Sequence, residues 1–329
     1  MRGIVVRNTG SWYVVRNEDG KLFLCKVKGN FRLRGIRSTN PVAVGDEVEI
    51  QPLTAADAQD DASLLSANGA GRQEAVALIT EILPRRNYII RKASNLSKQS
   101  HILAANVDQV LLVVTIAHPE THVVFIDRFL ASAEAYRIPV VLLFNKTDLY
   151  DAGELQRMAQ LTELYQGIGY RCLSCSALQN EGTAELAGIL NGQTTLLSGN
   201  SGVGKSTLLN MLIPGLDVAT AEISTAHDTG QHTTTFSEMY TLPAGGQIID
   251  TPGIKGFGTF DMEREEVGHY FREIFQESEG CRFNNCTHTH EPHCAVRRAV
   301  EEGHIAPSRY LSYLNMLEDK DEDKYRKAY

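Results

Sequence analysis

The first part of the chain alternates apolar and polar residues over short stretches. Apolar side chains at every second position, separated by turns that contain Gly and Asn, predict short strands at residues 4–6, 12–15, 22–27, 47–50 and 76–83. Residues 54–71 are rich in Ala, Asp, Ser, Asn and Gly without periodicity, which predicts a flexible loop. Short strands at this spacing favour a small closed β-barrel. We therefore expect an OB-fold-like domain over residues 1–85, with an SH3-like barrel as the alternative.

After residue 107 the pattern changes to strands and helices in alternation. Continuous apolar runs at 110–114 and 140–144 are typical of parallel strands that are buried on both faces. A segment with helical periodicity separates these runs, at 125–136, and another follows them, at 152–166. This alternation predicts a doubly wound α/β domain, which we place at residues 86–260.

Beyond residue 260 the chain is predicted to be helical. A stripe of apolar residues at helical spacing predicts a helix face that is buried in a core; it consists of Val267, Tyr270, Phe271, Ile274 and Phe275. Another helix is expected around residues 309–317, followed by a charged tail that should fray. The sequence therefore predicts a helical C-terminal domain over residues 261–329.

Charge is unevenly distributed along the chain. The formal net charge is -8, yet residues 1–40 contain nine Lys or Arg and two acidic residues, a local charge of +7. Residues 85–98 add five basic residues and no acidic one. A basic module on an acidic body is typical of a protein that contacts a polyanion with one part only. A solvated charged face is the alternative.

Composition narrows the class of protein further. No stretch reaches the roughly 18 apolar residues of a membrane-spanning helix, and the apolar run at the N-terminus is too short for a signal peptide. Of six cysteines, three lie between positions 281 and 294, which indicates a local metal site rather than a disulfide framework. We expect a cytoplasmic protein without membrane contact.

One motif is typical of phosphate binding. Residues 199–206 match GxxxxGK[ST] between a strand predicted at 195–198 and a helix predicted at 205–213. The backbone N–H groups of such a loop face phosphates, its lysine neutralises the β and γ phosphates, and its last hydroxyl ligates Mg²⁺. We expect Lys205 to be catalytic and Ser206 to hold magnesium. The predicted nucleotide contacts are Gly199, Asn200, Ser201, Gly202, Val203, Gly204, Lys205, Ser206 and Thr207.

Two later segments can complete the magnesium site. The sequence Asp-Thr-Pro-Gly at 250–253 follows a strand predicted at 247–249, which places the Asp250 carboxylate where it can hold the ion through water. Gly253 belongs to the same nucleotide-binding turn. A threonine run at 233–235 can close over the γ-phosphate, and Thr234 is the candidate that completes the metal shell.

A second motif predicts the base that is bound. Residues 145–148 read Asn-Lys-Thr-Asp and end the strand predicted at 140–144. The Asp148 carboxylate can accept hydrogen bonds from N1 and the 2-amino group of guanine, whereas adenine would leave it without partners. Lys146 can cover the ring, and Asn145 can tie this loop to the phosphate loop. Backbone N–H groups for guanine O6 are expected from Ser176 and Ala177.

The order of the motifs is unusual, because the guanine motif precedes the phosphate loop. Ligand-binding loops at the C-terminal ends of strands keep their places when a sheet is cut and rejoined elsewhere. The sequence therefore predicts a circularly permuted P-loop GTPase, and Asp148 disfavours an ATPase.

The C-terminal region contains a zinc-type ligand set. Three thiolates and one imidazole form a closed tetrahedral set that is typical of structural zinc; the candidates are Cys281, Cys286, His288 and Cys294. His290 and His293 are close enough to replace the imidazole ligand. The pair Cys172-x-x-Cys175 is a weaker redox or zinc candidate, because no second pair completes it.

Together these features resemble the bacterial RsgA (YjeQ/YloQ) family of GTPases that depend on the small ribosomal subunit. The resemblance rests on residues 104–109, 145–148, 199–206, 232–235, 250–253 and the cysteine pattern at 281–294. It implies a GTP hydrolase that binds GTP/GDP and rRNA, acts late in assembly of the small ribosomal subunit and is stimulated by that subunit. It also implies His288 as the nitrogen ligand of one structural Zn²⁺, beside Mg²⁺ that accompanies GTP.

Two expectations concern catalysis and assembly. Many GTPases place a water-orienting glutamine after Asp-x-x-Gly, where this chain has Ile254, so we expect slow intrinsic turnover. His232 is the nearest candidate to position water when the subunit orders residues 231–235, and a purely structural role is the alternative. We expect a monomer. The rival function is a GTP-gated switch protein that binds RNA or ribosomes and has little catalysis of its own.

Overall fold

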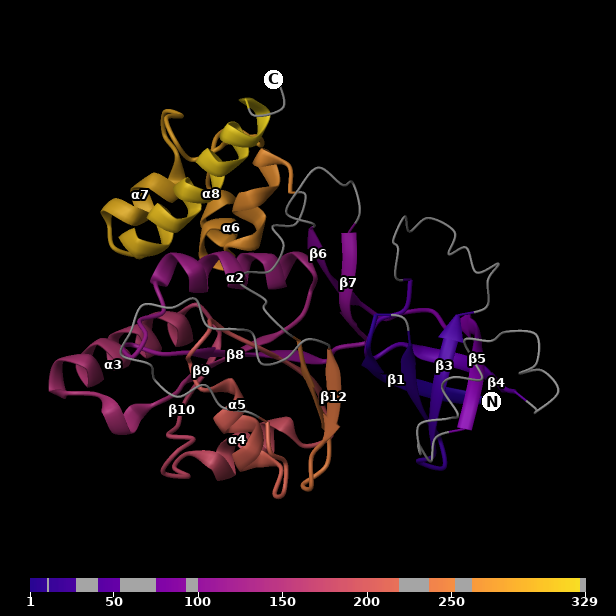
Figure 1. Cartoon of the computed structure of the whole chain (residues 1–329). Coiled ribbons are helices and arrows are strands. Elements are labelled where there is room, and N and C mark those ends of the chain that lie inside the picture. Colours follow the sequence, from indigo (N-terminus) through magenta and orange to yellow (C-terminus); the bar gives the residue numbers. More distant parts are fainter. Residues whose placement is uncertain are drawn as a thin grey trace. The chain divides into compact units, whose positions relative to one another are not determined.

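The computed structural model describes residues 1–10, 12–27, 41–53, 75–92, 100–218, 237–251 and 262–325 (Figure 1). The described elements form two compact units. The first contains β1–β7 together with β11–β13, and the second contains β8–β10 together with α2, α3 and α5–α8. The predicted loop 54–71 lies outside the described residues, as do His232, Thr234 and Gly253.

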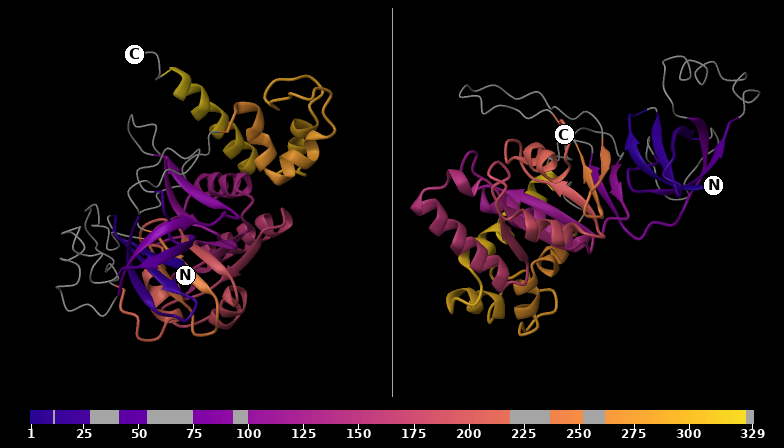
Figure 2. Two further views of the ribbon diagram at one scale, coloured as in Figure 1. Left: turned by 90° about the vertical axis from the view of Figure 1, so that its right-hand side faces the viewer. Right: turned by 90° about the horizontal axis from the view of Figure 1, so that it is seen from below.

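Five strands in the first unit close into a barrel, which is seen best in the right-hand view of Figure 2. The strand order is β1-β2-β3-β5-β4, and β4 returns to pair with β1. The strands are β1 (Arg2–Asn8), β2 (Tyr13–Asn17), β3 (Leu22–Val27), β4 (Glu47–Pro52) and β5 (Ala75–Ile82). Alternate side chains point inward and form a buried apolar core. This closed barrel confirms the predicted OB-type architecture.

A hairpin follows the barrel within the same unit, and the sequence pattern did not predict it. Its strands are β6 (Tyr88–Lys92) and β7 (Ser100–Ala105), which pair antiparallel. The backbone near its end runs close to Gly45, where a Cβ would lie 2.1 Å from the Ala105 carbonyl oxygen. Only glycine fits there, and its φ of 92° is also in the left-handed region.

The first unit also contains strands from later in the chain. Strands β11 (Thr194–Ser198) and β13 (Gln247–Asp250) pair in parallel, and β12 (Glu238–Thr241) pairs antiparallel with β13. Strand β12 also pairs with β1 of the barrel, with Arg7 opposite Glu238. The barrel is therefore hydrogen-bonded directly to a strand of the predicted α/β domain.

The second unit holds the parallel strands that the apolar runs predicted. Strands β8 (Gln109–Val114), β9 (Val140–Phe144) and β10 (Arg171–Ser174) pair in parallel. All five side chains of β9 are buried, as expected for a strand that is covered on both faces. Helices α2 (Val123–Ala135) and α3 (Ala152–Gly167) connect these strands, and α4 (Thr183–Leu190) follows β10. The predicted α/β alternation is confirmed.

The C-terminal helices pack on α2, as Figure 1 shows. They are the 3₁₀ helix η3 (Arg264–Tyr270), α6 (Arg272–Ser278), α7 (Ala295–Glu301) and α8 (Pro307–Tyr325). Two expectations were wrong. The predicted apolar stripe is interrupted at Phe271, whose ψ of 102° is not helical, so the side chain of Phe275 is 49% exposed. The helix expected around residues 309–317 is longer than predicted, because α8 continues to Tyr325.

A buried ion network joins three of these helices to one another. The Arg309 guanidinium on α8 is 0% exposed and donates to Asp127 Oδ1 on α2 at 2.8 Å and to Glu273 Oε1 on α6 at 2.6 Å. The hydroxyl of Tyr165 on α3 donates to the same Asp127 oxygen at 2.8 Å. The guanidinium also lies over the ring of Phe271, 4.6 Å from its centre. Among the described residues, no helix has the length and apolar character needed to cross a membrane.

Candidate nucleotide-binding site and metal centre

The predicted phosphate loop connects β11 to α5 (Lys205–Leu212). Its backbone requires glycine at two close approaches. At Gly199, with φ 140°, a Cβ would lie 2.3 Å from the Val113 carbonyl oxygen, and at Gly204, with φ 95°, it would lie 2.4 Å from Asn145 Nδ2. The loop therefore has the tight left-handed turns that expose successive N–H groups at a helix N-terminus.

Lys205 lies over this loop. Its ammonium donates to the carbonyl oxygens of Gly199 and Asn200, both at 2.7 Å. These carbonyls hold the positive charge above the loop, where phosphate oxygens would lie. Ser206 and Thr207 follow in the first turn of α5 and are half-buried.

The base-binding motif is tied to the phosphate loop through Asn145, as predicted. The Asn145 side chain is 1% exposed, and its amide donates to the Val203 carbonyl oxygen at 2.8 Å. Its side-chain oxygen accepts from the Ala177 N–H at 3.1 Å and from the Cys175 thiol at 3.3 Å. One buried side chain thus joins the motif at 145–148 to the phosphate loop and to the segment at 175–177.

The base-reading groups lie on the 3₁₀ turn η2 (Thr147–Leu149) and the following segment. Asp148 is exposed, and its Oδ1 accepts from the Ser176 hydroxyl at 2.5 Å. The two backbone N–H groups expected to face guanine O6 have partners within the chain: Ser176 donates to Glu181 and Ala177 to Asn145. A guanine O6 would therefore have to share the Ala177 N–H with Asn145.

Lys146 adopts the left-handed conformation, with φ 68°. Its ammonium donates to the His118 carbonyl oxygen at 2.5 Å. Burial lowers the pKa of Lys146, while the charge of Asp148 opposes that change. This contact holds the end of the Lys146 side chain at the loop 115–121.

Sequence reasoning missed Tyr150. Its side chain is 8% exposed, and its hydroxyl donates to the Asn145 carbonyl oxygen at 2.5 Å and accepts from the Ile116 N–H at 2.8 Å. An aromatic residue just after a strand-end motif gives no signal of such a contact, because the partners are backbone groups far apart in the chain.

The predicted magnesium ligands are only partly described. Asp250 is 6% exposed, ends β13 and lies opposite Leu197 of β11 in the parallel register. Since Gly199 follows Leu197 by two residues, the carboxylate belongs to the strand beside the one that enters the phosphate loop. Thr234, Gly253 and the catalytic candidate His232 lie outside the described residues.

Four predicted ligands gather in the segment between α6 and α7. The ligand atoms of Cys281, Cys286, His288 and Cys294 all lie within 4.8 Å of one another. His288 Nδ1 lies 3.6 Å from Cys281 Sγ and 3.4 Å from Cys294 Sγ, and those two sulfurs lie 3.9 Å apart. The cluster can hold a metal ion.

Neighbouring groups fix the shape of this cluster. His288 is buried with φ 56°, whereas His290 and His293 are exposed and outside the cluster. The hydroxyl of Tyr310 on α8 donates to the His288 carbonyl oxygen at 2.6 Å. Burial raises the pKa of the Cys286 thiol to about 12, so a metal ion that binds there has to displace a proton.

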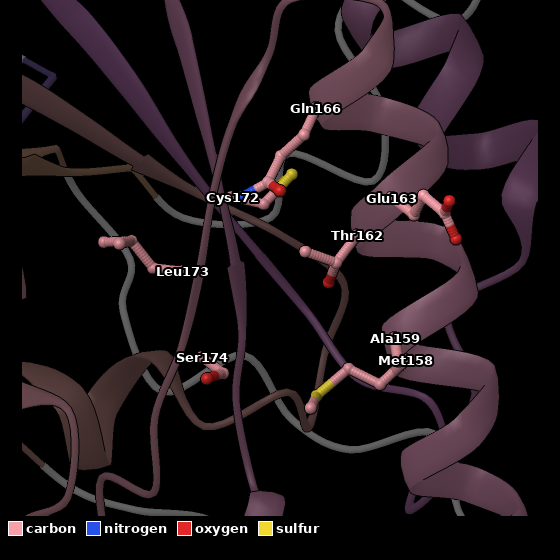
Figure 3. A pocket seen from close by; sticks show the side chains of 8 residues that line it. All are labelled: Met158, Ala159, Thr162, Glu163, Gln166, Cys172, Leu173 and Ser174. Atoms are coloured by element: carbon pink, nitrogen blue, oxygen red, sulfur yellow. The ribbon is translucent and has the colours of Figure 1, made fainter.

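The other cysteine pair does not have the properties of a redox site. Burial raises the pKa of both the Cys172 and the Cys175 thiol to about 12, which keeps them protonated and unreactive. A cavity of about 450 Å³ lies beside Cys172, between α3 and β10. In Figure 3, Met158, Thr162 and Gln166 point from α3 toward the strand, and Glu163 points away. This cavity contains none of the predicted nucleotide contacts.

A phosphate loop that a buried asparagine tethers to a guanine-type loop, in reversed chain order and in a chain that also contains an OB-type barrel, defines a circularly permuted P-loop GTPase. The RsgA GTPase family model matches residues 82–260, and the RsgA N-terminal domain model matches residues 2–59. The chain belongs to the RsgA family of GTPases, enzymes that hydrolyse GTP.

Relatives and solved structures agree with this assignment. A protein of Bacteroides fragilis named small ribosomal subunit biogenesis GTPase RsgA is 61% identical over 329 residues, 100% of both chains. The crystal structure of YjeQ from Thermotoga maritima is similar with a TM-score of 0.72 at 36% identity, covering 97% of both chains. YloQ, a circularly permuted GTPase, matches with a TM-score of 0.69 at 27% identity, covering 98% of this chain and 95% of that one.

Proposed function

We propose that this GTPase acts late in maturation of the small ribosomal subunit, binds its rRNA and hydrolyses GTP faster on the subunit than alone. The observation that carries the proposal is full-length identity of 61% to a protein named small ribosomal subunit biogenesis GTPase RsgA. Identity across the barrel, the GTPase region and the cysteine cluster supports a shared partner as well as shared chemistry. A cytoplasmic location and a monomeric state belong to the same proposal.

The barrel is the proposed RNA-binding surface. The ammonium of Lys26 lies over the half-buried ring of Trp12, 4.6 Å from its centre. Aromatic rings beside cations are typical of barrels that bind single-stranded nucleic acid. Arg7 and Arg16 are engaged instead with residues of β12 and β13, so the local charge is only partly open to RNA.

In the nucleotide site, we assign guanine recognition to Asp148 and phosphate binding to the backbone of residues 199–206. Lys205 stabilises the charge that develops on the γ-phosphate. Ser206, Asp250 and Thr234 would hold Mg²⁺, which would supply positive charge to neutralise the phosphates. This division of roles is supported by the Asn145 tether, which holds the base-reading loop against the phosphate loop.

We assign the metal of the C-terminal cluster as structural Zn²⁺. Ligands of a tetrahedral zinc ion lie about 3.8 Å apart for two sulfurs and about 3.6 Å apart for a sulfur and a nitrogen. The distances of 3.9 Å between Cys281 and Cys294 and of 3.4 and 3.6 Å to His288 fit such a centre. We place the barrel domain at residues 1–85, the GTPase domain at 86–260 and the zinc domain at 261–329. The family-model match over residues 82–260 supports the bounds of the GTPase domain.

Turnover of GTP with and without purified small subunits tests the proposed function. We expect slow hydrolysis by the protein alone and strong stimulation by small subunits, with none by large subunits. A protein that binds subunits in a GTP-dependent manner without faster hydrolysis would instead be the rival GTP-gated switch.

Replacement of Asp148 by Asn tests the base assignment, because an amide can donate to the O2 of xanthine. Asp148→Asn should weaken GTP binding and improve binding of xanthosine triphosphate.

A further inference from the structure

The Tyr150 side chain returns to the loop from which it emerges. The tyrosine follows the 3₁₀ turn η2 directly, and its hydroxyl donates to the carbonyl oxygen of Asn145, five residues earlier, at 2.5 Å. The bond closes a ring of backbone and side chain around the base-reading segment. Asp148 lies within the segment that this bond closes, and its side chain is exposed.

The same hydroxyl accepts a hydrogen bond from a second loop. The Ile116 N–H donates to it at 2.8 Å from just beyond the end of β8. Two residues further on, the His118 carbonyl accepts from Lys146 at 2.5 Å. The base-reading loop is thus fastened to the loop at 115–121 at two points, one through Tyr150 and one through Lys146.

The loop at 115–121 also contacts the phosphate loop. A Cβ added at Gly202 would lie 3.3 Å from Cδ of Pro119, so these two segments are in close contact. On its own side, the loop is braced by the Thr121 hydroxyl, which accepts from the Thr115 N–H at 3.1 Å. Tyr150 therefore links the base-reading loop to a braced segment that borders the phosphate loop.

The environment of the hydroxyl makes it a permanent donor. Tyr150 is 8% exposed, and burial raises the pKa of its hydroxyl to about 12. It is protonated at every physiological pH and offers no acid or base to the reaction. Its two partners are backbone groups, and the Asn145 carbonyl belongs to the peptide that enters the left-handed Lys146. Rotation of that peptide would change the direction of the segment that carries Asp148.

We propose that Tyr150 is a positioning residue for guanine recognition: its hydroxyl holds the Asn145–Asp148 segment against the loop at 115–121 and so sets the affinity and selectivity for guanine nucleotides. The proposal rests on the base-reading role assigned above to Asp148. The phenylalanine variant keeps the ring and its packing but leaves the Asn145 carbonyl and the Ile116 N–H without their partner.

The test compares Tyr150→Phe with wild-type protein in equilibrium binding of GTP, GDP and xanthosine triphosphate. We expect about a ten-fold loss of affinity for GTP and GDP, about 1.4 kcal/mol, with faster nucleotide release. Affinity for xanthosine triphosphate should fall less, so the preference for GTP over xanthosine triphosphate should become smaller. In turnover stimulated by small subunits, KM for GTP should rise by a similar factor while kcat stays near the wild-type value, because the phosphate loop is unchanged.

Tyr170→Phe is the matched control. Tyr170 is 3% exposed in the same unit, and its hydroxyl has no hydrogen-bond partner among the described residues. Loss of the Tyr170 hydroxyl should leave nucleotide binding unchanged.

Asp148→Asn, measured in parallel, separates the two proposals. If Asp148→Asn shifts selectivity but Tyr150→Phe binds all three nucleotides as wild type does, the positioning role is wrong. If Tyr150→Phe lowers kcat and leaves KM unchanged, the role is equally wrong. If Asp148→Asn has no effect on selectivity, the base assignment fails and the role of Tyr150 fails with it.

Discussion

The buried Arg309 network supports a quantitative prediction about the docking of the C-terminal helices. Burial by itself lowers the pKa of Arg309, but the hydrogen bonds and charges of Glu273 and Asp127 outweigh this effect and raise it, so the guanidinium stays charged in the core. Replacement of Arg309 by Ala removes the cation that contacts both of these carboxylates. Two carboxylates are then left in or near an apolar core.

The expected cost follows from the burial of the partners. Removing one member of a fully buried, hydrogen-bonded ion pair costs roughly 3–5 kcal/mol, chiefly because the remaining charge stays desolvated. Asp127 is 0% exposed and the Glu273 side chain 12% exposed, so the upper part of that range, about 4 kcal/mol, is expected. At about 2–4 °C per kcal/mol for a unit of this size, the melting temperature should fall by roughly 8 °C or more.

Calorimetry and amide hydrogen exchange check this prediction. In Arg309→Ala, amide exchange should accelerate in α2, α6 and α8. The fluorescence of Trp12, the single tryptophan of the chain, should stay as in wild type because the barrel remains folded. Arg298→Ala is the matched control, because its pair with Glu302 is 4.0 Å long and both side chains are more than half exposed, at 69% and 53%. That control should cost at most about 0.5 kcal/mol. Equal melting temperatures for Arg309→Ala and Arg298→Ala would refute the reasoning.

Three further predictions concern the metal centre and the reaction. Cys286→Ala should lose stoichiometric metal in elemental analysis and loosen the C-terminal helices, whereas nucleotide affinity should survive; full metal content would contradict the site. For Glu291, burial raises the pKa, but hydrogen bonds from Thr287 and other groups outweigh it and lower the pKa to about 2. In acid-unfolding curves, the stability difference between wild type and Glu291→Gln should therefore be full above about pH 4.5 and vanish as pH falls toward 2. A stability difference that does not depend on pH would show that it does not come from the lowered pKa of Glu291. Lys205→Ala should abolish basal and stimulated hydrolysis, whereas His232→Ala should keep GTP affinity and lose most of the stimulated rate; full stimulation of His232→Ala would remove the histidine from the mechanism.

The parts of the site that sequence could predict are those whose chemistry is local. Gly199 and Gly204 are required by backbone turns within one loop, and their spacing from Lys205 is fixed by the helix that follows. The Cys₃His set was predictable for the same reason, because its four ligands fall within 14 consecutive residues, 281–294. The Asn145 tether was predictable only because two strong motifs implied a common ligand.

Other features depend on contacts between distant segments, which leave no mark in a local pattern. In the sequence, Tyr150 cannot be distinguished from an ordinary apolar residue, because its partner Ile116 contributes only a backbone N–H. The sequence predicted a helix around residues 309–317 but gave no sign that Arg309 is buried, because its partner Asp127 lies 182 residues away in the chain. Phe275 was placed in the core because helical spacing was extrapolated across Phe271, where the backbone leaves the helical region.

Strand β12, which follows the threonine run at 233–235 in the sequence, is paired with barrel strand β1. The chain leaves that run into β12, where the Asn8 N–H of barrel strand β1 donates to the Ser237 carbonyl oxygen at 3.2 Å and Arg7 Nε donates to Glu238 at 2.8 Å. The Arg7 and Glu238 side chains are 47% and 26% exposed, so their ion pair contributes at most about 1 kcal/mol. Backbone pairing and the hydrogen bonds from Arg16 to Thr241 and Gln247 also link the barrel to β12 and β13. If the barrel binds rRNA as proposed, Arg7 can exchange Glu238 for a phosphate at little cost, and the register of β12 is kept while the charge beside it changes.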